Sequence, residues 1–218
     1  MTNHPIILAS NSPRRRQLLA LAGLEFSVIV AGVDESLQAN ESPASYVLRL
    51  AETKARAVAA VPDQIVLAAD TTVVDGDHIL GKPQDAAEAR AMLTQLRGRT
   101  HQVYTGIALL RKSDDTLLTA LSVTDVPMRN YSNEELNAYI ATGDPLDKAG
   151  AYAIQHPEFK PVAHMDGCFA GVMGLPLCHV LRLLRQLGTN PQADLPAQCQ
   201  ALLEYSCPVS DQVLSGAL

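Results

Sequence analysis

The sequence predicts an α/β fold, because short apolar runs alternate with longer segments that begin at helix-capping residues. Residues 6–10 and 26–31 are the first two strand-like runs, and we expect a helix between them from Pro13 to about Gly23. Ser12 suits the N-cap of this helix, proline suits its first position, and glycine suits the residue after the last turn. The chain is therefore expected to open with a β-α-β unit.

The same signals predict the elements that follow. Residues 65–69 are an unbroken apolar run, typical of a strand buried on both faces, and we expect Asp70 to end it. A hairpin turn is expected at 75–76, and a long β-hairpin is expected from the β-rich stretches 101–111 and 117–129. The other expected helices run from Ser42-Pro43 to about Ala60, from Asp85 to near Gly98, from Ser132 to about Thr142, and from Gly174-Leu-Pro176 to Gly188.

The last segment of the chain, 189–218, contains several prolines and is typical of an appended extension. One short helix is expected in it, at 196–204. We therefore expect one domain over 1–188, followed by a C-terminal extension. The sequence leaves open whether this extension covers a sheet edge or a dimer surface.

Composition excludes several classes of protein. With 47% hydrophobic and 18% charged residues among 218, the chain can bury one large core or two small ones, and no disordered class fits. A formal net charge of −6 argues against a nucleic-acid binder, so local basic clusters indicate local anions. The first residues carry neither a secretory leader nor an apolar span of about 20 residues, which predicts a cytoplasmic protein without a membrane partner.

Three consecutive arginines occupy 14–16, in the first turn of the helix that begins at Pro13. A helix N-terminus is locally positive, and each misplaced cation there costs on the order of 0.3–1 kcal/mol unless an anion is near. A phosphate would reverse that cost. The alternative is an exposed basic turn, but three arginines behind Ser10 and Ser12 favour an anion site.

Lys54 departs from the pattern of the second expected helix. The positions that share its face, 47, 50, 51, 55 and 58, are all apolar, whereas charged residues were already available on the opposite face. A lysine stem can snorkel from such a stripe to solvent. The alternative is that Lys54 reaches into a cleft and holds a phosphate, and the sequence leaves both open.

Two acidic residues are candidates for the chemistry. Asp70 is expected at the carboxyl end of the most apolar strand, where α/β sheets gather their sites and where an isolated carboxylate is costly to bury. A carboxylate there can hold a divalent cation or accept a proton from an attacking water, although an aspartate can also simply start a turn. Glu35 follows the second strand and is a candidate second acidic ligand, with an ordinary exposed loop glutamate as the alternative.

Two apparent motifs are rejected. Residues 76–82 match the glycine and lysine spacing of a P-loop, but Pro83 stands where a hydroxyl for Mg²⁺ is needed. Lys82 is then expected to meet a phosphate only as a point charge. A zinc site is rejected because the spacings of the candidate ligands repeat no known pattern; these are His156, His164, Cys168, Cys178 and His179.

Six segments together closely resemble the Maf family of nucleoside triphosphate pyrophosphatases, in order and spacing from about residue 6 to 187. They are Ser10-Asn-Ser-Pro-Arg-Arg15, Ala69-Asp70-Thr71, Gly81-Lys82-Pro83, Gly98-Arg-Thr-His-Gln-Val-Tyr-Thr-Gly106, Pro145-Leu-Asp-Lys-Ala-Gly-Ala-Tyr152 with Gln155, and Gly174-Leu-Pro-Leu177. The resemblance implies a Maf/inosine-triphosphatase-like α/β fold, with a long twisted mixed sheet, flanking helices and two lobes around a central cleft, often assembled as a homodimer. It also implies hydrolysis of a nucleoside triphosphate to the monophosphate and pyrophosphate with Mg²⁺ or Mn²⁺.

The resemblance further implies roles for individual residues. Asp70 matches the family's proton acceptor, and Arg14, Thr71 and Gln155 match positions that distinguish its branches, here as in the branch that acts on dTTP and UTP. Our hypothesis is that a divalent cation bridges the triphosphate to Asp70 and Glu35 while water attacks the α-phosphorus. The expected substrate-binding residues are Ser10, Arg14, Arg15, Lys54, Thr71, Lys82 and Gln155.

Departures from the family pattern leave the preferred base open. His156-Pro157-Glu158 replaces a glycine-rich turn, and Gly167-Cys168-Phe169 replaces Gly-Ser-Tyr; we expect both to line or approach the base pocket. A house-cleaning enzyme for modified nucleotides and a nucleotide-sensing regulator of cell division without hydrolysis are the alternatives. The acidic pair favours hydrolysis, because Asp70 and Glu35 would repel phosphate in a pure binder that lacked a metal.

Overall fold

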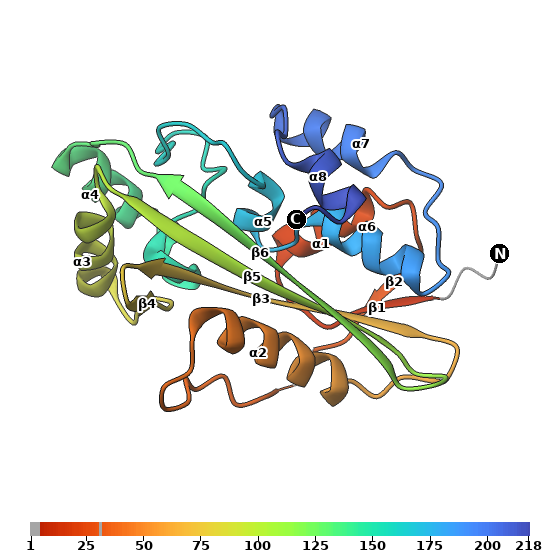
Figure 1. Cartoon of the computed structure of the whole chain (residues 1–218). Coiled ribbons are helices and arrows are strands. Elements are labelled where there is room, and N and C mark those ends of the chain that lie inside the picture. The colour runs from red at the N-terminus through yellow and green to blue at the C-terminus, as the bar shows by residue number, and fades with distance from the viewer. Residues whose placement is uncertain (1–4, 31) are drawn as a thin grey trace.

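Within residues 5–30 and 32–218, which the computed structural model describes, a six-stranded mixed sheet forms the centre of the molecule (Figure 1). The strand order is β2-β1-β3-β5-β6, with the short β4 paired to β3. β1 runs parallel to β2 and β3, whereas β3, β4, β5 and β6 pair with one another in antiparallel fashion. Their bounds are β1 Ile6–Leu8, β2 Phe26–Val28, β3 Ile65–Asp75, β4 His78–Leu80, β5 Thr100–Arg111 and β6 Thr116–Pro127.

Helices cover both faces of this sheet, as Figure 1 shows. α2 packs on one face, and α1, α5 and α6 lie on the other, while α3 and α4 stand together at one end of the long strands. The bounds are α1 Pro13–Ala20, α2 Pro43–Ala57, α3 Ala86–Leu96, α4 Asn133–Ala141, α5 Phe169–Met173 and α6 Leu177–Gln186, with two 3₁₀ turns at Asp144–Asp147 and Ala149–Ala151. The predicted α/β class, a mixed sheet with flanking helices, is confirmed.

The helix starts follow the capping chemistry of the sequence. Ser12 and Ser42 accept hydrogen bonds from the backbone N–H groups three residues on, at 3.4 and 3.2 Å. Ser132 and Glu135 form a reciprocal capping box. These predictions are confirmed, as is the long β5–β6 hairpin. Ala31, the last residue of the expected second strand, lies outside the described residues.

Alternation along β3 divides the core into two layers. Val66 and Ala68 point to the side of α2, where they pack with Ala51 and Ala55. Their odd-numbered neighbours join the larger core on the side of α1 and α6. Because successive side chains of a strand point to opposite faces, the side chains of the next two residues of β3, Asp70 and Thr71, point toward different helices.

Asp70 does not end its strand, contrary to expectation. β3 continues to Asp75 because β5 pairs with it as far as Val74. Its other neighbour, β1, ends at Leu8, opposite Leu67. Asp70 therefore lies beyond the carboxyl end of β1 rather than at the end of β3. At this point β3 no longer has β1 beside it.

The extension packs onto the domain through two helices. α7 (Leu195–Leu203) matches the expected helix, whereas α8 (Ser210–Ser215) was not expected. Leu195 and Val213 are buried, and Arg182 of α6 donates a hydrogen bond to the carbonyl of Val213 at 3.0 Å. α8 has only six residues, too few for the sequence to show a helical pattern of apolar positions. The helix is therefore recognised only in the structure, where it packs on α6.

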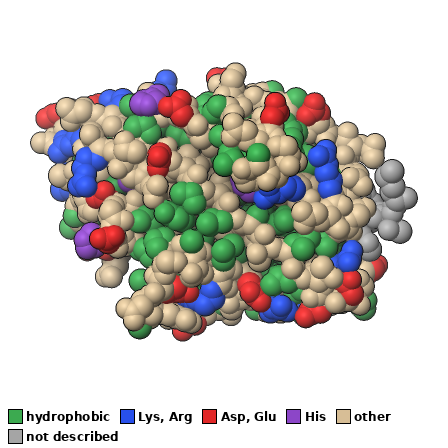
Figure 2. Space-filling view, viewed as in Figure 1, with side chains coloured by type: hydrophobic (Ala, Val, Ile, Leu, Met, Phe, Trp, Pro, Cys, Tyr) green, Lys and Arg blue, Asp and Glu red, His purple; other side chains and the backbone are tan. Residues whose placement is uncertain are grey.

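The surface carries charges of both signs. Figure 2 shows acidic and basic side chains interspersed over one face, with apolar side chains gathered toward its middle. None of the helices among the described residues is long and apolar enough to cross a membrane.

Candidate active site

A cavity of about 530 Å³ opens beside β3, where β1 has ended. Residues of α2, on one face of the sheet, and residues of α1, on the other face, line the same cavity. The structure brings together there all nine residues that the sequence analysis assigned to substrate, metal or proton transfer. They are Ser10, Arg14, Arg15, Glu35, Lys54, Asp70, Thr71, Lys82 and Gln155.

Lys54 links the two acidic residues of the cavity. Its Nζ lies 2.6 Å from Oδ1 of Asp70 and 2.8 Å from Oε1 of Glu35. The side chains of Lys54 and Asp70 are 13% and 11% exposed, whereas that of Glu35 is 54% exposed. The sequence left open whether Lys54 reaches into a cleft or out to solvent. In the structure its ammonium lies in the cleft.

Asp70 is ionised less readily than an ordinary aspartate. Burial raises its pKa above the usual value, although the Lys54 ammonium and the Arg15 guanidinium act in the opposite direction. A carboxylate with a raised pKa is a stronger base. Asp70 is thus suited to accept a proton inside the cavity.

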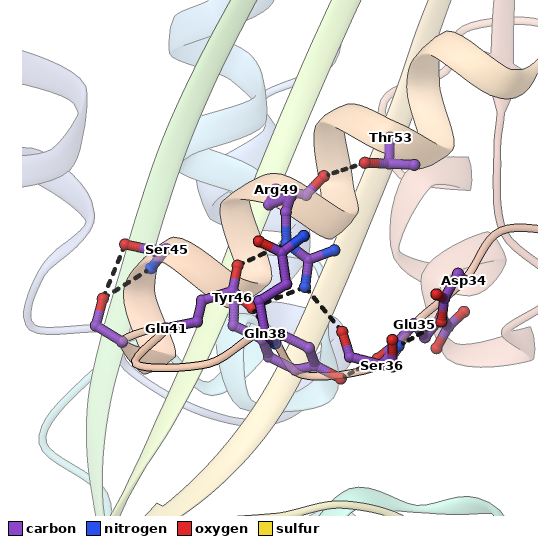
Figure 3. Close-up of polar contacts among 10 residues, drawn as sticks. Asp34, Glu35, Ser36, Gln38, Glu41, Ser45, Tyr46, Arg49 and Thr53 are labelled. Atoms are coloured by element: carbon purple, nitrogen blue, oxygen red, sulfur yellow. Dashed lines mark hydrogen bonds and ion pairs between the residues drawn. The ribbon is translucent and has the colours of Figure 1, made fainter.

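The loop that carries Glu35 is fastened to α2 (Figure 3). The Tyr46 hydroxyl donates to the carbonyl of Glu35 at 2.9 Å, and Arg49 donates to the carbonyl of Ser36 at 3.0 Å. Arg49 also holds both carboxylate oxygens of Glu41, at 2.6 and 2.7 Å, which lowers the pKa of Glu41. The helix that supplies the site lysine therefore also positions the loop that supplies the second acid.

Arg15 directs three of its N–H donors to the protein. Nε donates to the carbonyl of Gly174 at 2.8 Å, and the terminal nitrogens donate to the hydroxyls of Ser10 at 3.2 Å and Thr71 at 3.1 Å. Thr71 in turn shares a 2.9 Å hydrogen bond with Thr105 of β5. Arg15 thus joins α1, β3 and the turn after α5, which gives it a positioning role in the cavity wall.

The other predicted residues lie nearer to solvent. Arg14 is half-buried, and Lys82 and Gln155 are exposed on the cavity wall. Lys82 follows the β3–β4 hairpin, as expected once the P-loop interpretation is rejected. These three side chains are therefore accessible to a ligand that enters from solvent.

Sequence reasoning missed Lys148. This lysine is buried in the cavity wall, and its Nζ contacts the carbonyl and Oδ1 of Asp144, at 2.6 and 2.8 Å, and Oδ1 of Asp147 at 2.6 Å. It lies within the segment Pro145 to Tyr152, which the resemblance had already marked. The missed signal was a lysine that follows Asp144 and Asp147 and precedes the small residues 149–151.

Neither departure from the family pattern lines the cavity, although 156–158 directly follow Gln155, which does. That they approach the base pocket stays a prediction. Among the described residues that line the cavity, none belongs to 156–158 or 167–169. His156 accepts a hydrogen bond from the backbone of Phe159 at 3.0 Å and packs edge-on against Tyr139. Cys168 caps α5, and only the far end of that helix reaches the cavity.

Asp70 and Glu35 fit a divalent cation. Among the described residues, no group of three or more His, Cys, Asp or Glu side chains is arranged to hold a metal. Two carboxylate oxygens nevertheless converge on one cation already, the Lys54 ammonium. Mg²⁺ commonly binds through one or two carboxylates together with phosphate oxygens and water, so Asp70 and Glu35 are the residues that would hold such a cation.

Comparison with known proteins agrees with the resemblance. The family model Maf, described as Maf-like protein, matches residues 5–187. The chain is 50% identical over 184 residues to the dTTP/UTP pyrophosphatase of Myxococcus xanthus, covering 84% of this chain and 92% of that protein. It is 48% identical over 185 residues to the dTTP/UTP pyrophosphatase of Bacillus cytotoxicus, covering 84% and 96%. Among solved structures, a HAM1 protein from Coxiella burnetii aligns with a TM-score of 0.46 and 17% identity over 98% of this chain and 95% of that one. The chain belongs to the Maf family.

Proposed function

We propose that this protein hydrolyses nucleoside triphosphates, with dTTP and UTP as its substrates, to the monophosphate and pyrophosphate. The observation that carries the proposal is the meeting of a base and cations in one cavity, with the raised pKa of Asp70 and the Lys54 ammonium 2.6 Å away. The names of relatives that are 50% and 48% identical support the choice of dTTP and UTP.

Cations in the wall bind the triphosphate. Arg14 and Lys82 are accessible from solvent, and Lys54 reaches the same space from α2. Phosphoryl chemistry depends mainly on positioning and on neutralising charge, which guanidinium and ammonium groups supply. Arg15 supports this arrangement from behind, through its hydrogen bonds to Ser10 and Thr71.

Asp70 accepts the proton of the attacking water. The water oxygen forms a bond to the α-phosphorus, the bond from that phosphorus to the bridging oxygen breaks, and pyrophosphate leaves with the electron pair. Asp70 and Glu35 would hold Mg²⁺ or Mn²⁺, which would neutralise charge on the phosphate oxygens. A homodimer, which the family resemblance implies, and a cytoplasmic location complete the proposal.

A substrate panel tests the reaction directly. The purified chain is incubated with dTTP, UTP, CTP, GTP and modified pyrimidine triphosphates, with Mg²⁺ or Mn²⁺, and the products are separated by chromatography. We expect equal amounts of monophosphate and pyrophosphate, formed fastest from dTTP and UTP. Release of single phosphates would contradict the proposal, and preference for a modified nucleotide would favour the house-cleaning alternative.

Asp70→Asn tests the mechanism. Loss of a general base commonly costs about 10²–10⁴-fold in rate, so we expect turnover to fall by that amount while dTTP affinity is retained in calorimetry. Asp77→Asn, in the exposed turn between β3 and β4, is the matched control. Pyrophosphate release by Asp70→Asn at the wild-type rate would overturn the assignment. Tight dTTP binding by the wild type with no product would instead favour the regulator.

A further inference from the structure

Four thiols converge on one small cavity beneath the C-terminal extension. All four cysteines of the chain line it: Cys168, Cys178, Cys199 and Cys207. The cavity measures about 20 Å³, which is room for about one water molecule, so the four thiols line a nearly filled space. Two of the cysteines come from the Maf domain and two from the extension, which lies beyond the family match that ends at residue 187.

Tyr205 fixes the extension on the segment that carries Cys168. Its hydroxyl donates to the carbonyls of Gly167 at 2.9 Å and Met165 at 3.2 Å, and its ring packs against Phe169 with centroids 5.6 Å apart. Both immediate neighbours of Cys168 are therefore in contact with this one tyrosine. Cys207 follows Tyr205 by two residues and lines the same cavity.

Cys207 lies within electrostatic reach of the other three thiols. Burial, aided by a smaller effect of a charge on Cys207, raises the pKa of Cys168 and Cys178 to about 12 and that of Cys199 to about 11. These three thiols therefore stay protonated near neutral pH, and protonated thiols react slowly with oxidants. Cys207 is partly exposed, so an oxidant from solvent can reach it.

We propose that Cys207 and Cys168 are a peroxide-responsive pair that forms a disulfide between the extension and the Maf domain. The Cys207 thiolate attacks one oxygen of hydrogen peroxide, and the O–O bond breaks. Hydroxide departs, and Cys207 becomes a sulfenic acid. The Cys168 sulfur then attacks the Cys207 sulfur, and the sulfenic oxygen leaves as water with the thiol proton. Two thiols and one peroxide give one disulfide and two waters, so the sulfurs are oxidised and the peroxide is reduced.

This disulfide would act on the active cavity through α5. The Sγ of Cys168 accepts a hydrogen bond from the backbone of Gly171 at 3.3 Å and thereby caps α5. At the other end of that helix, Val172 and Met173 line the active cavity, and the next carbonyl holds Arg15. Engaging Cys168 in a disulfide withdraws the cap, so oxidation is expected to reduce turnover.

Thiol counting and peptide mapping test the pair without reference to the enzymatic activity. The full-length chain is reduced, freed of reductant, treated with hydrogen peroxide and alkylated under denaturing conditions. We expect two of the four thiols to be lost, an intact mass lower by two hydrogens, and a linked peptide that joins Cys168 to Cys207. Dithiothreitol should restore all four thiols, and the reaction should be faster at higher pH, because the thiolates react.

Single substitutions locate the pair. Cys207→Ser and Cys168→Ser should each abolish the linked peptide, whereas Cys178→Ser and Cys199→Ser should still lose two thiols. Cys207→Ser should keep its turnover after peroxide treatment, in contrast to a several-fold, dithiothreitol-reversible loss in the wild type. Four thiols surviving peroxide, or a linked peptide that joins Cys199 to Cys207, would overturn the proposal. The wild-type map decides this even where a variant folds poorly.

Discussion

Gly106 pairs with Asp70 in the β3–β5 ladder, and α2 presses on the sheet at this same glycine. A Cβ at Gly106 would lie 2.6 Å from the carbonyl oxygen of Val47 and 2.8 Å from the backbone nitrogen of Leu48, both in α2. Such backbone atoms cannot move aside as a flexible side chain can. The residue opposite the acid therefore sets how closely α2, and with it Lys54, approaches Asp70.

Gly106→Ala should separate α2 from the sheet. Overpacking of this kind costs about 1–3 kcal/mol in the free energy of unfolding. Turnover should fall more than the loss of folded protein explains, because the 2.6 Å contact between Lys54 and Asp70 lengthens. Urea unfolding and kcat, measured where the variant is fully folded, check this. Gly32→Ala is the control, since nothing lies within 4 Å of its added Cβ; equal behaviour of the two variants would contradict the constraint.

Lys54→Met should move the acidic limb of the pH–rate profile upward. Asp70 must be ionised to accept a proton, so activity falls as the pH drops through its pKa. Burial already raises that pKa, and Lys54 partly opposes the rise. The wild-type limb should therefore lie above the ordinary aspartate value, and the limb of Lys54→Met higher still.

The position of the limb in kcat/KM against pH is the measurement, because the amplitude also reports weaker substrate binding. Arg56→Met is the control, since Arg56 pairs with Glu52 and Asp115 outside the cavity. A limb for Lys54→Met that coincides with that of the wild type would show that the lysine does not set the ionisation of Asp70.

Local chemistry predicted the helix ends but not the extent of β3. The Ser132 cap and the turn at Gly76 depend on residues that are neighbours in sequence, so the sequence alone predicted them. The continuation of β3 past Asp70 depends on pairing with residues 102–105 of β5, which lie 28 to 34 residues away in the chain. A strand that loses one neighbour and keeps the other cannot be recognised from its own residues.

The nine candidate residues line one cavity, but their contacts could not be predicted from the sequence. Lys54 was identified because it breaks an apolar stripe, whereas its partner Glu35 lies in an irregular loop fixed by Tyr46. Lys148 was missed because its three acceptors come from a 3₁₀ turn that no periodicity marks. The cysteine cluster was missed for a similar reason, since the fold of the extension places Cys199 and Cys207 in one cavity with Cys168 and Cys178.

Arg15→Lys should show that Arg15 is a positioning residue. A lysine ammonium cannot reach three acceptors on three different segments as the guanidinium fork does. Leaving these partly buried acceptors unpaired should cost about 1–3 kcal/mol of unfolding free energy. KM for dTTP should rise several-fold, because Ser10 and Thr71 lose their common partner. Arg16→Lys, an exposed residue of the same turn, is the control; identical melting curves and KM values for the two variants would argue against the assignment.

Two buried histidines should make the fold sensitive to acid. Burial lowers the pKa of His101 and of His179 to about 4, and Nδ1 of each has no hydrogen-bond partner among the described residues. An unfolded histidine titrates near 6.5, so between these values the unfolded chain holds more protons than the folded one. Stability should therefore fall as the pH falls through this window, by about 2 kcal/mol per histidine between about pH 7 and pH 5.

His179→Gln isolates one of these contributions. Its unfolding free energy should fall less steeply from neutral to acidic pH than that of the wild type, because glutamine binds no proton in the unfolded chain. His164→Gln is the control, because the His164 side chain is 65% exposed and is not buried in the core. Urea unfolding at a series of pH values gives the three slopes. A slope for His179→Gln as steep as that of the wild type would mean that His179 is not held neutral by the α6 core.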